Sequence, residues 1–476
     1  MSLAEERRPV VGCGSYSIAA VAIRQCGSSV EWGYRMFSRP LRHSWQIAAI
    51  LAVIVILLSP DGSSAQQYLP TPYDAAASHA TMVSEVPSPA NSFVGSIGVN
   101  THFTQWPYIG RNEPPVLNLL IASGIRHIRD GMVGSLIPAV RHLAANGVRT
   151  TFAIDINVTD ATIKSWPGTV GYAFEAYEGP NEPNYLPGDW VSRTRAFMRR
   201  LYADVKGNRA LAGYPILAPA LSKGQEQLGD LSALVDYGNM HDYFDTYNPG
   251  TPGWGNQHPP FGTYGSLSYN MKLAGVNSGS KRVMSTETGY GSTPTGTSTY
   301  LDDATAAKYM MRIYFVHYNA GVPRTFMYEF LDQDSTGRPF TNNGLVYLNL
   351  QPKPSYKALH AIISFLADHP GASFAPTALT YQVTGNLANV RHTLLQKSDG
   401  TYYLALWIEV PSWSKGHAYA IPSQQVNIVT HNKMRSASVM QLDDAGNARI
   451  VQLAGMPGYR TGLPVTDRIS IVKLTP

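Results

Sequence analysis

The chain has 476 residues, enough for two or three domains with buried cores. It carries 37 Lys and Arg residues against 32 Asp and Glu residues, and no basic run is interleaved with aromatic residues. Nucleic-acid binding depends on clustered positive charge, so this composition argues against a nucleic-acid partner. The composition is otherwise typical of a globular protein.

The N-terminal region has the parts of an export signal. The unbroken apolar run Ile47–Leu58 is too short for a spanning helix of about 20 residues but fits the apolar region of a secretory signal. Arg39 and Arg42 form a positive flank, and small residues precede position 66. We therefore predict a signal peptide over about residues 36–65 and a secreted or periplasmic mature chain that starts near Gln66. A retained signal anchor is the alternative.

Cleavage at this point would remove both cysteines. Cys13 and Cys26 lie ahead of Met36, so the mature chain would have neither disulfides nor a catalytic thiol. It would keep 31 basic and 28 acidic residues, a near-neutral balance that suits an uncharged substrate better than a polyanion. No stable membrane association is expected after cleavage.

Hydrophobic patterning divides the remaining chain into three parts. Residues 66–92 are rich in Ala, Ser and Pro and indicate a linker. In residues 93–370, short apolar runs alternate with helix-like stretches, which predicts a (β/α)8 TIM barrel, with an open doubly wound sheet as the alternative. The expected strands are Val94–Val99, Ile125–Ile128, Arg149–Ile154, Ala176–Glu178, Ile216–Pro219, Tyr237–Met240, Arg282–Ser285 and Thr325–Tyr328.

After about Pro370 no long helical pattern remains. Strand-like runs include Val390–Leu395 and Tyr402–Ile408, and Ser398-Asp399-Gly400 is a turn signal between them. Residues 371–476 are therefore expected to form an all-β sandwich that follows the barrel. Residues 1–65 would be the upstream extension and signal peptide.

Polar side chains gather where the predicted barrel strands end. The carboxyl ends of all strands in such a barrel face one pocket, so these residues form a list of candidate site residues. The members of the list are Asn100, His102, Arg129, Asp130, Asp155, Asn157, Asn181, Glu182, His241, Tyr243, Glu287 and Glu329. Two carboxylates facing each other across a pocket can hydrolyse a glycosidic bond, and Glu182 and Glu287 are the expected pair.

The order of these motifs resembles the retaining glycosidases of clan A, the 4/7 superfamily, and within it families 39 and 5. The resemblance rests on Arg129 after the second strand, Asn181-Glu182-Pro183 after the fourth, His241-Asp242-Tyr243 after the sixth and Glu287 after the seventh. The segment from Tyr328 to Leu359 is also similar to the stretch that closes many such barrels.

The resemblance implies a role for each residue. Glu182 would be the general acid/base and Glu287 the nucleophile. Asn181 would donate to the sugar 2-hydroxyl, Arg129 would keep the nucleophile ionised, and Tyr243 would fix its rotamer. Glu182 would need an apolar environment near a second carboxylate in order to stay protonated.

Other residues are expected to bind substrate. His102, Asp155, His241 and Glu329 are placed for this by their strand ends, although Glu329 departs from the aromatic residue that many relatives carry there. Flat aromatic rings suit the apolar faces of sugars, and the tryptophans in loops on that side are Trp106, Trp166, Trp190 and Trp254, of which we favour Trp254. No metal-ligand spacing, serine elbow or phosphate loop is present, so neither a cofactor nor a metal is expected.

These patterns together predict an exported retaining β-glycosidase that acts on an oligo- or polysaccharide through a covalent glycosyl-enzyme. One alternative is a transglycosylase with the same catalytic residues, which would differ in how well the acceptor site excludes water. Another is a carbohydrate-binding protein without turnover. The presence of both glutamates argues against this second alternative.

Overall fold

The computed structural model describes residues 81–334 and 340–476. The predicted signal peptide and both cysteines lie outside these residues. Within them, no helix is both long enough and apolar enough to cross a bilayer.

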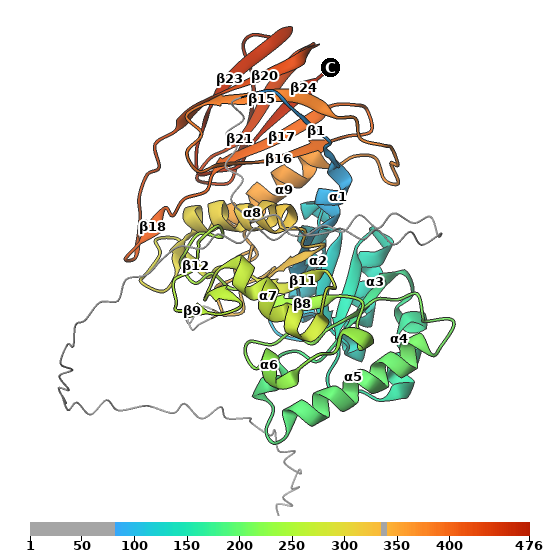
Figure 1. Cartoon of the computed structure of the whole chain (residues 1–476). Helices are drawn as coiled ribbons and strands as arrows, with labels where there is room; N and C mark the ends of the chain where they lie inside the picture. Colours follow the sequence, from blue (N-terminus) through green and yellow to red (C-terminus); the bar gives the residue numbers. More distant parts are fainter. Residues whose placement is uncertain (1–80, 335–339) are drawn as a thin grey trace, which may run out of the picture. The chain divides into compact units, whose positions relative to one another are not determined.

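A closed parallel barrel forms the first part of the described chain (Figure 1). Seven neighbouring pairs are hydrogen-bonded in parallel in the order β7-β6-β5-β4-β3-β14-β11-β8, and a parallel bridge from Leu217 to Tyr237 joins the two edges. The strands are β3 (Ile97–Asn100), β4 (His127–Gly131), β5 (Arg149–Ala153), β6 (Phe174–Glu178), β7 (Ile216–Leu217), β8 (Gly238–His241), β11 (Val283–Thr288) and β14 (Thr325–Met327). The expected TIM barrel is thereby confirmed.

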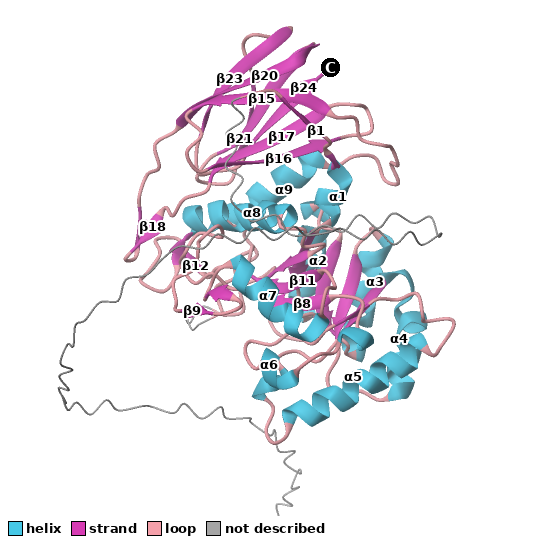
Figure 2. Ribbon diagram, in the orientation of Figure 1, coloured by secondary structure: helices cyan, strands magenta, loops and turns pink. Residues whose placement is uncertain are grey.

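Helices surround the barrel strands, as Figure 2 shows in cyan. They are α1 (Ala90–Gly95), α2 (Glu113–Ser123), α3 (Ile137–Ala145), α4 (Asp160–Val170), α5 (Trp190–Lys206), α6 (Gln225–Leu228), α7 (Leu267–Ser278), α8 (Asp303–Asn319) and α9 (Pro354–Leu366). Side-chain caps begin several of them: the Asp189 carboxylate accepts from Ser192 N, and the Asp302 carboxylate accepts from Thr305 N. Such caps satisfy amide groups that have no partner within the helix.

Several strands have bounds that differ from the prediction, and two of these differences are informative. The run expected as strand Val94–Val99 is divided, because α1 follows Pro89 and ends at Gly95 before β3 begins. Phe93 and Val94 are buried in either arrangement, so apolar content alone could not separate helix from strand. The strand β11 is also longer than expected and includes Glu287.

The last part of the chain forms the two sheets of a β-sandwich, in which all strand pairs except β2 with β16 are antiparallel. This confirms the all-β prediction for the region. One sheet has the order β1-β15-β20-β23 and the other β2-β16-β17-β24-β21-β22. Their strands are β1 (Val83–Glu85), β2 (Ser88–Pro89), β15 (Leu379–Gly385), β16 (Val390–Gln396), β17 (Tyr402–Ile408), β20 (Gln424–Met434), β21 (Ser436–Leu442), β22 (Ala448–Gln452), β23 (Gly458–Val465) and β24 (Ser470–Thr475). Short two-residue strands occur in loops: β9 (Gln257–His258), β10 (Gly262–Thr263), β12 (Ser292–Thr293), β13 (Leu301–Asp302), β18 (Trp413–Ser414) and β19 (His417–Ala418).

Residues 83–89 belong to the sandwich rather than to a linker. The strand β1 pairs with β15, Val83 opposite Tyr381, and β2 pairs in parallel with β16, Ser88 opposite Leu395. The sequence indicated a linker for residues 66–92 because these strands are very short and their partners lie about 300 residues further along. Local composition therefore gave no sign of the pairing.

Buried polar contacts join the sandwich to the barrel. Arg312 of α8 is 0% exposed and donates to the carbonyl oxygens of Ile408 and Val410. The Glu409 carboxylate of the sandwich accepts from Asn248 Nδ2 at 2.6 Å and from Gly250 N at 3.2 Å, both in the loop after β8. These contacts fix a loop that begins beside the candidate site.

Candidate active site

A cavity of about 500 Å³ opens at the carboxyl ends of the barrel strands. The site residues predicted from sequence that line this cavity are Asn100, His102, Arg129, Asp130, Asp155, Asn181, Glu182, Tyr243 and Glu287. Parallel strands that end at one side of the barrel bring these side chains together from six strands and the loops after them. This volume lies within the range of about 300–1,000 Å³ that is usual for small-molecule sites.

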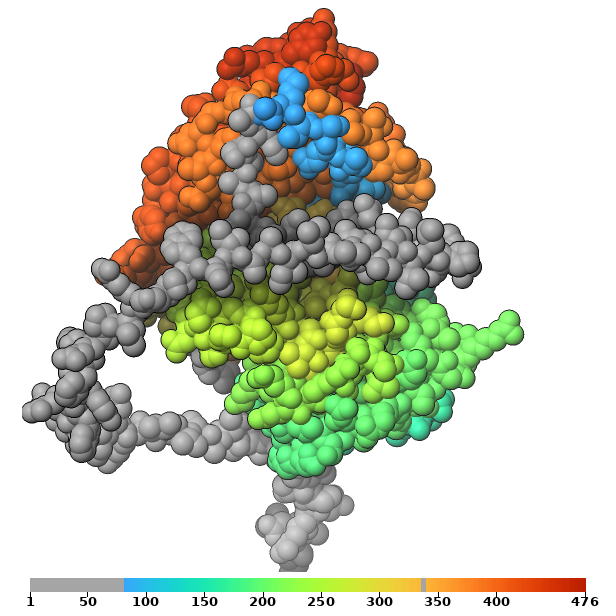
Figure 3. Space-filling model, in the orientation of Figure 1, coloured from blue at the N-terminus to red at the C-terminus, as the bar shows by residue number. Residues whose placement is uncertain are grey.

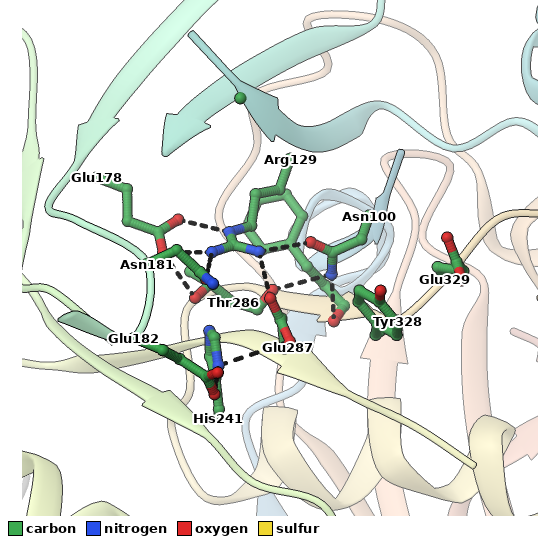
Figure 4. A network of polar contacts seen from close by, with 12 residues as sticks. Asn100, Arg129, Glu178, Asn181, Glu182, His241, Thr286, Glu287, Tyr328 and Glu329 are labelled. Atoms are coloured by element: carbon green, nitrogen blue, oxygen red, sulfur yellow. Dashed lines mark hydrogen bonds and ion pairs between the residues drawn. The ribbon is translucent and has the colours of Figure 1, made fainter. Parts of the chain in front are cut away.

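Arg129 is the centre of the polar network in Figure 4. It is 5% exposed, and all five of its N–H groups have acceptors. Its Nε donates to Glu178 Oε2 at 2.7 Å, and Nη2 donates to Glu178 Oε1 at 2.9 Å. Nη1 donates to Glu287 Oε1 at 2.7 Å. The other two donate to Asn100 Oδ1 at 2.9 Å and to Asn181 Oδ1 at 2.6 Å. Arg129 therefore orients its neighbours and has no donor left for a substrate.

The contacts of Arg129 also orient two carboxamides. Because Asn181 Oδ1 accepts from Arg129, the Nδ2 group of Asn181 is available as a donor toward the cavity. Asn100 is turned the other way, since its Nδ2 donates to Thr286 O at 2.9 Å, inside the barrel. One asparagine thus has a donor available to the cavity, while the other links neighbouring strands.

Glu287 is held on both of its oxygens. Arg129 donates to Oε1, and the Tyr243 hydroxyl donates to Oε2 at 2.9 Å. Burial opposes ionisation of this carboxyl, but the charges of His241 and Arg129 and the hydrogen bonds from Tyr243 and Arg129 outweigh it and lower the pKa of Glu287. Burial and the Glu287 charge raise the pKa of Tyr243, so that the phenol stays a donor. The arrangement favours a carboxylate with a fixed rotamer.

Glu182 lies across the site, with His241 between it and Glu287. His241 Nδ1 is 3.0 Å from Glu182 Oε1 and 3.5 Å from Glu287 Oε2. The two carboxylate oxygens therefore cannot be farther apart than the sum of these distances, about 6.5 Å. The side chain of Glu182 is 27% exposed and that of Glu287 is 12% exposed. The pair thus consists of one carboxyl open to the cavity and one more enclosed.

The backbone of Glu182 has a left-handed conformation, with φ at 41°. Its amide donates to Ala220 O at 3.0 Å, and Pro183 follows it directly. Left-handed conformations are uncommon for residues other than glycine and cluster at functional sites. The turn ends β6 and presents the Glu182 side chain to the cavity.

His102 and Glu329 form a second, deeper polar pair. His102 Nε2 is 3.2 Å from Glu329 Oε2, and the Glu329 side chain is fully buried. Burial raises the pKa of the Glu329 carboxyl, against the effect of His102. Burial lowers the pKa of His102, but its contacts with Glu329 outweigh this and raise it overall. Glu329 therefore does not line the cavity itself, whereas its partner His102 does.

The other sequence candidates are placed less centrally. Asp155 lines the cavity but is exposed, and its Oδ1 accepts from the backbone and side chain of Asn157. Trp254 does not line the cavity; its ring stacks on Tyr247 at 4.7 Å, so it supports the loop after β8. Trp166 is only 5% exposed and belongs to the core. Trp106 is 62% exposed.

Three residues of the site were missed from the sequence. Glu178 ends β6 and was taken only as part of a strand, although a carboxylate directly after the apolar residues Ala176 and Tyr177 is a usable signal. Tyr328 and Phe340 line the cavity, and both rings contact Tyr243 edge-on, at centroid distances of 6.4 and 5.4 Å. These rings supply the aromatic surface that position 329 does not.

A buried triad lies behind the site and is formed by Asp242 directly after β8, Ser285 of β11 and His317 of α8. Asp242 Oδ2 is 3.0 Å from His317 Nε2, and Asp242 Oδ1 accepts from the Ser285 hydroxyl at 2.5 Å. All three residues are fully or almost fully buried. Since Asp242 N also donates to Glu287 O at 3.1 Å, these contacts fix β8 against β11.

Comparisons with solved structures support the fold. A family 39 glycoside hydrolase from the gut symbiont Bacteroides cellulosilyticus WH2 is 15% identical, with a TM-score of 0.56 over 82% of this chain and 83% of that chain. A monomeric β-xylosidase from Caulobacter crescentus CB15 is 13% identical, with a TM-score of 0.53 over 83% and 98%. A family 39 enzyme from Xanthomonas axonopodis pv. citri is 12% identical, with a TM-score of 0.51 over 82% and 96%.

At these identities the matches show a shared fold and nothing finer. No protein-family model and no curated protein sequence matches the chain. Because one barrel fold supports many chemistries, the activity has to be argued from the site.

Proposed function

We propose that the chain is a retaining β-glycosidase that hydrolyses the O-glycosidic bonds of an oligo- or polysaccharide. One observation carries the proposal: His241 Nδ1 contacts both Glu182 and Glu287, so their oxygens are at most about 6.5 Å apart. Retaining enzymes hold the two carboxyl groups about 5–5.5 Å apart, whereas inverting enzymes need about 6.5–9.5 Å to admit a water. The short separation favours direct attack by one carboxylate.

Glu287 has the features of the nucleophile. It is the more enclosed of the two glutamates, and its pKa is lowered, so that the carboxylate is present at neutral pH. In the first step its oxygen attacks the anomeric carbon and forms a glycosyl ester, while the bond to the leaving oxygen breaks. Arg129 and Tyr243 keep its two oxygens in a fixed orientation during the attack.

Glu182 has the features of the acid/base. Glu182 Oε1 is 3.0 Å from His241 Nδ1, the Glu182 carboxyl is open to the cavity, and the mechanism assigns the acidic proton to it. Glu182 transfers this proton to the leaving oxygen in the first step. In the second step it takes a proton from water, whose oxygen attacks the anomeric carbon and releases Glu287. Asn181 Nδ2 donates to the sugar 2-hydroxyl, a contact that tightens in the transition state.

We also propose that the enzyme acts outside the cytoplasm. The segment 36–65 has the charged, apolar and small-residue regions of an export signal. N-terminal sequencing of the protein from its native host should begin near Gln66. Recovery of intact chain that still carries Cys13 in the cytosol would contradict export.

The test of the catalytic proposal is azide rescue of two variants. Glu182→Ala should retain activity on aryl glycosides with good leaving groups, and azide should accelerate it and give a glycosyl azide of retained configuration. Glu287→Ala should be almost inactive, and any azide product should have the inverted configuration. Proton NMR identifies the anomers. Glu226→Ala, which removes an exposed carboxylate of α6, is the matched control.

Four outcomes would change the proposal. Inverted sugar as the first product of the unaltered enzyme would refute a retaining mechanism. The opposite azide behaviour of the two variants would exchange the roles of the glutamates. Binding of oligosaccharides without any turnover would favour the carbohydrate-binding alternative, and oligosaccharide products longer than the substrate would favour a transglycosylase.

A further inference from the structure

Glu178 is a carboxylate of the site to which the mechanism above assigns no role. It is the last residue of β6 and is 0% exposed. Its Oε2 accepts from Arg129 Nε at 2.7 Å, and its Oε1 accepts from Arg129 Nη2 at 2.9 Å and from Asn239 Nδ2 at 3.0 Å. A buried carboxylate is costly unless it is paired in this way. Its contacts reach β4 and β8, so it joins the strands around the site.

The two contacts from Glu178 to Arg129 determine how the guanidinium lies. A bidentate pair fixes the plane of the guanidinium as well as its position. With Nε and Nη2 held by Glu178, the remaining edge of Arg129 is directed to Glu287 Oε1 at 2.7 Å, as Figure 4 shows. The orientation of Arg129 against Glu287 therefore depends on Glu178.

The shared charge of Arg129 is a second link between Glu178 and Glu287. One guanidinium contacts two carboxylates, Glu178 and Glu287, in a site where Arg129 is 5% exposed. The positive charge that Glu287 experiences is thus partly offset by Glu178. A nucleophile that is ionised but not overstabilised remains reactive, because nucleophilicity decreases as the basicity of the attacking group decreases.

We propose that Glu178 is a positioning residue of the active site, which orients Arg129 against Glu287 and moderates the positive charge at the nucleophile. The inference rests on the proposed function, since it takes Glu287 as the nucleophile. It extends that function to a residue that does not touch the substrate.

The experiment measures the rate at which the nucleophile is trapped covalently, as a function of pH. A 2-deoxy-2-fluoro glycoside with a dinitrophenolate leaving group forms the glycosyl ester without needing an acid, so its trapping rate reports on Glu287 alone. The rate rises with pH as Glu287 ionises, and this acid limb gives the pKa of the nucleophile. The other charged or titratable groups that face Glu287 are Arg129, His241, Tyr243, Glu182, His102 and Tyr328, and the variants keep all of them.

Glu178→Gln removes the charge with little change of size. Arg129 would keep its contacts with Asn100, Asn181 and Glu287, and its charge would no longer be shared. The pKa of Glu287 should therefore fall, and the acid limb should move to lower pH. The trapping rate at neutral pH should fall about 10-fold or more, the effect of losing one charged hydrogen bond at the site. Glu178→Asp keeps the charge, so its rate should fall while its acid limb stays near that of the unaltered enzyme.

Glu175→Gln is the matched control. Glu175 lies on the same strand and pairs with Arg324 at 2.8 Å and with His127 at 2.8 Å, away from the cavity. Its loss should lower the melting temperature and leave both the trapping rate and the acid limb unchanged. A Glu178→Gln enzyme that behaves in the same way would overturn the inference, because Glu178 would then be purely structural.

Failure of the proposed function would look different. Mass spectrometry of the trapped enzyme should find the label on Glu287 in the unaltered chain. Label on another residue, or none, would overturn the proposed function itself and this inference with it. Label on Glu287 together with an unshifted acid limb in Glu178→Gln would be consistent with the proposed function. It would contradict only the inference about Glu178.

Discussion

Replacing Glu409 should destabilise the barrel and the sandwich together. This carboxylate accepts from Asn248 Nδ2, from Gly250 N and, within the sandwich, from Trp407 Nε1 at 2.8 Å. Arg312 Nη2 is 3.6 Å away, and the side chains of both Arg312 and Glu409 are almost fully buried. Glu409→Ala would leave three donors and one buried cation without the carboxylate.

The size of the effect follows from these contacts. Removing one partner of a buried charge pair costs about 3–5 kcal/mol, because the other charge stays buried and unpaired. Unfolding entropy is about 2 cal/mol/K per residue, so a folded chain of about 400 residues loses about 4–6 °C in melting temperature for this cost. Glu409→Gln keeps one acceptor oxygen, so its melting temperature should lie between those of the unaltered chain and Glu409→Ala.

Differential scanning calorimetry of the purified protein measures the change. The unaltered chain should unfold in one transition if these contacts make barrel and sandwich one cooperative unit. Glu226→Gln, an exposed carboxylate on α6, is the control and should stay within about 0.5 kcal/mol. A Glu409→Ala protein that melts within a degree of the unaltered chain would refute the reasoning, as would a sandwich that unfolds separately from the barrel.

Three further predictions concern the site and the sandwich. Tyr243→Phe removes a hydrogen bond that lowers the pKa of Glu287, so kcat/KM should fall about 10–100-fold and its acid limb should move to higher pH, as a pH–rate profile would show. Asn181→Ala should lose about 10–100-fold on a normal glycoside but almost nothing on its 2-deoxy analogue in parallel assays, because only the former has the 2-hydroxyl. A chain that ends at residue 370 should be insoluble or strongly destabilised, and a soluble, active barrel of unchanged melting temperature would contradict this.

The positions of the two glutamates were predictable because strand polarity decides them. A polar residue directly after a buried parallel strand must lie at the carboxyl end of the barrel. Glu182 follows β6, and the structure places Glu287 near the end of β11, so both reach the same cavity. The contacts of Arg129 and Tyr243 with Glu287 agree with what the resemblance to clan A glycosidases implied.

Contacts between distant strands were not predictable in the same way. Glu178 lies three residues before Asn181, which was singled out, yet its partners Arg129 and Asn239 are on other strands. Trp254 was expected at the substrate because its loop leaves the correct end of the barrel. Its ring packs instead on Tyr247, a contact that depends on how the loop folds on itself.

The strands β1 and β2 have a consequence for synthesis on the ribosome. They leave the exit tunnel before any barrel strand, but β15 and β16, their partners, are made about 300 residues later. At a translation rate of about 5–20 residues per second, this is a delay of about 15–60 s. During that interval the barrel can assemble while β1 and β2 of the sandwich have no partner strands. The sandwich then closes last, around a segment that was synthesised before the barrel.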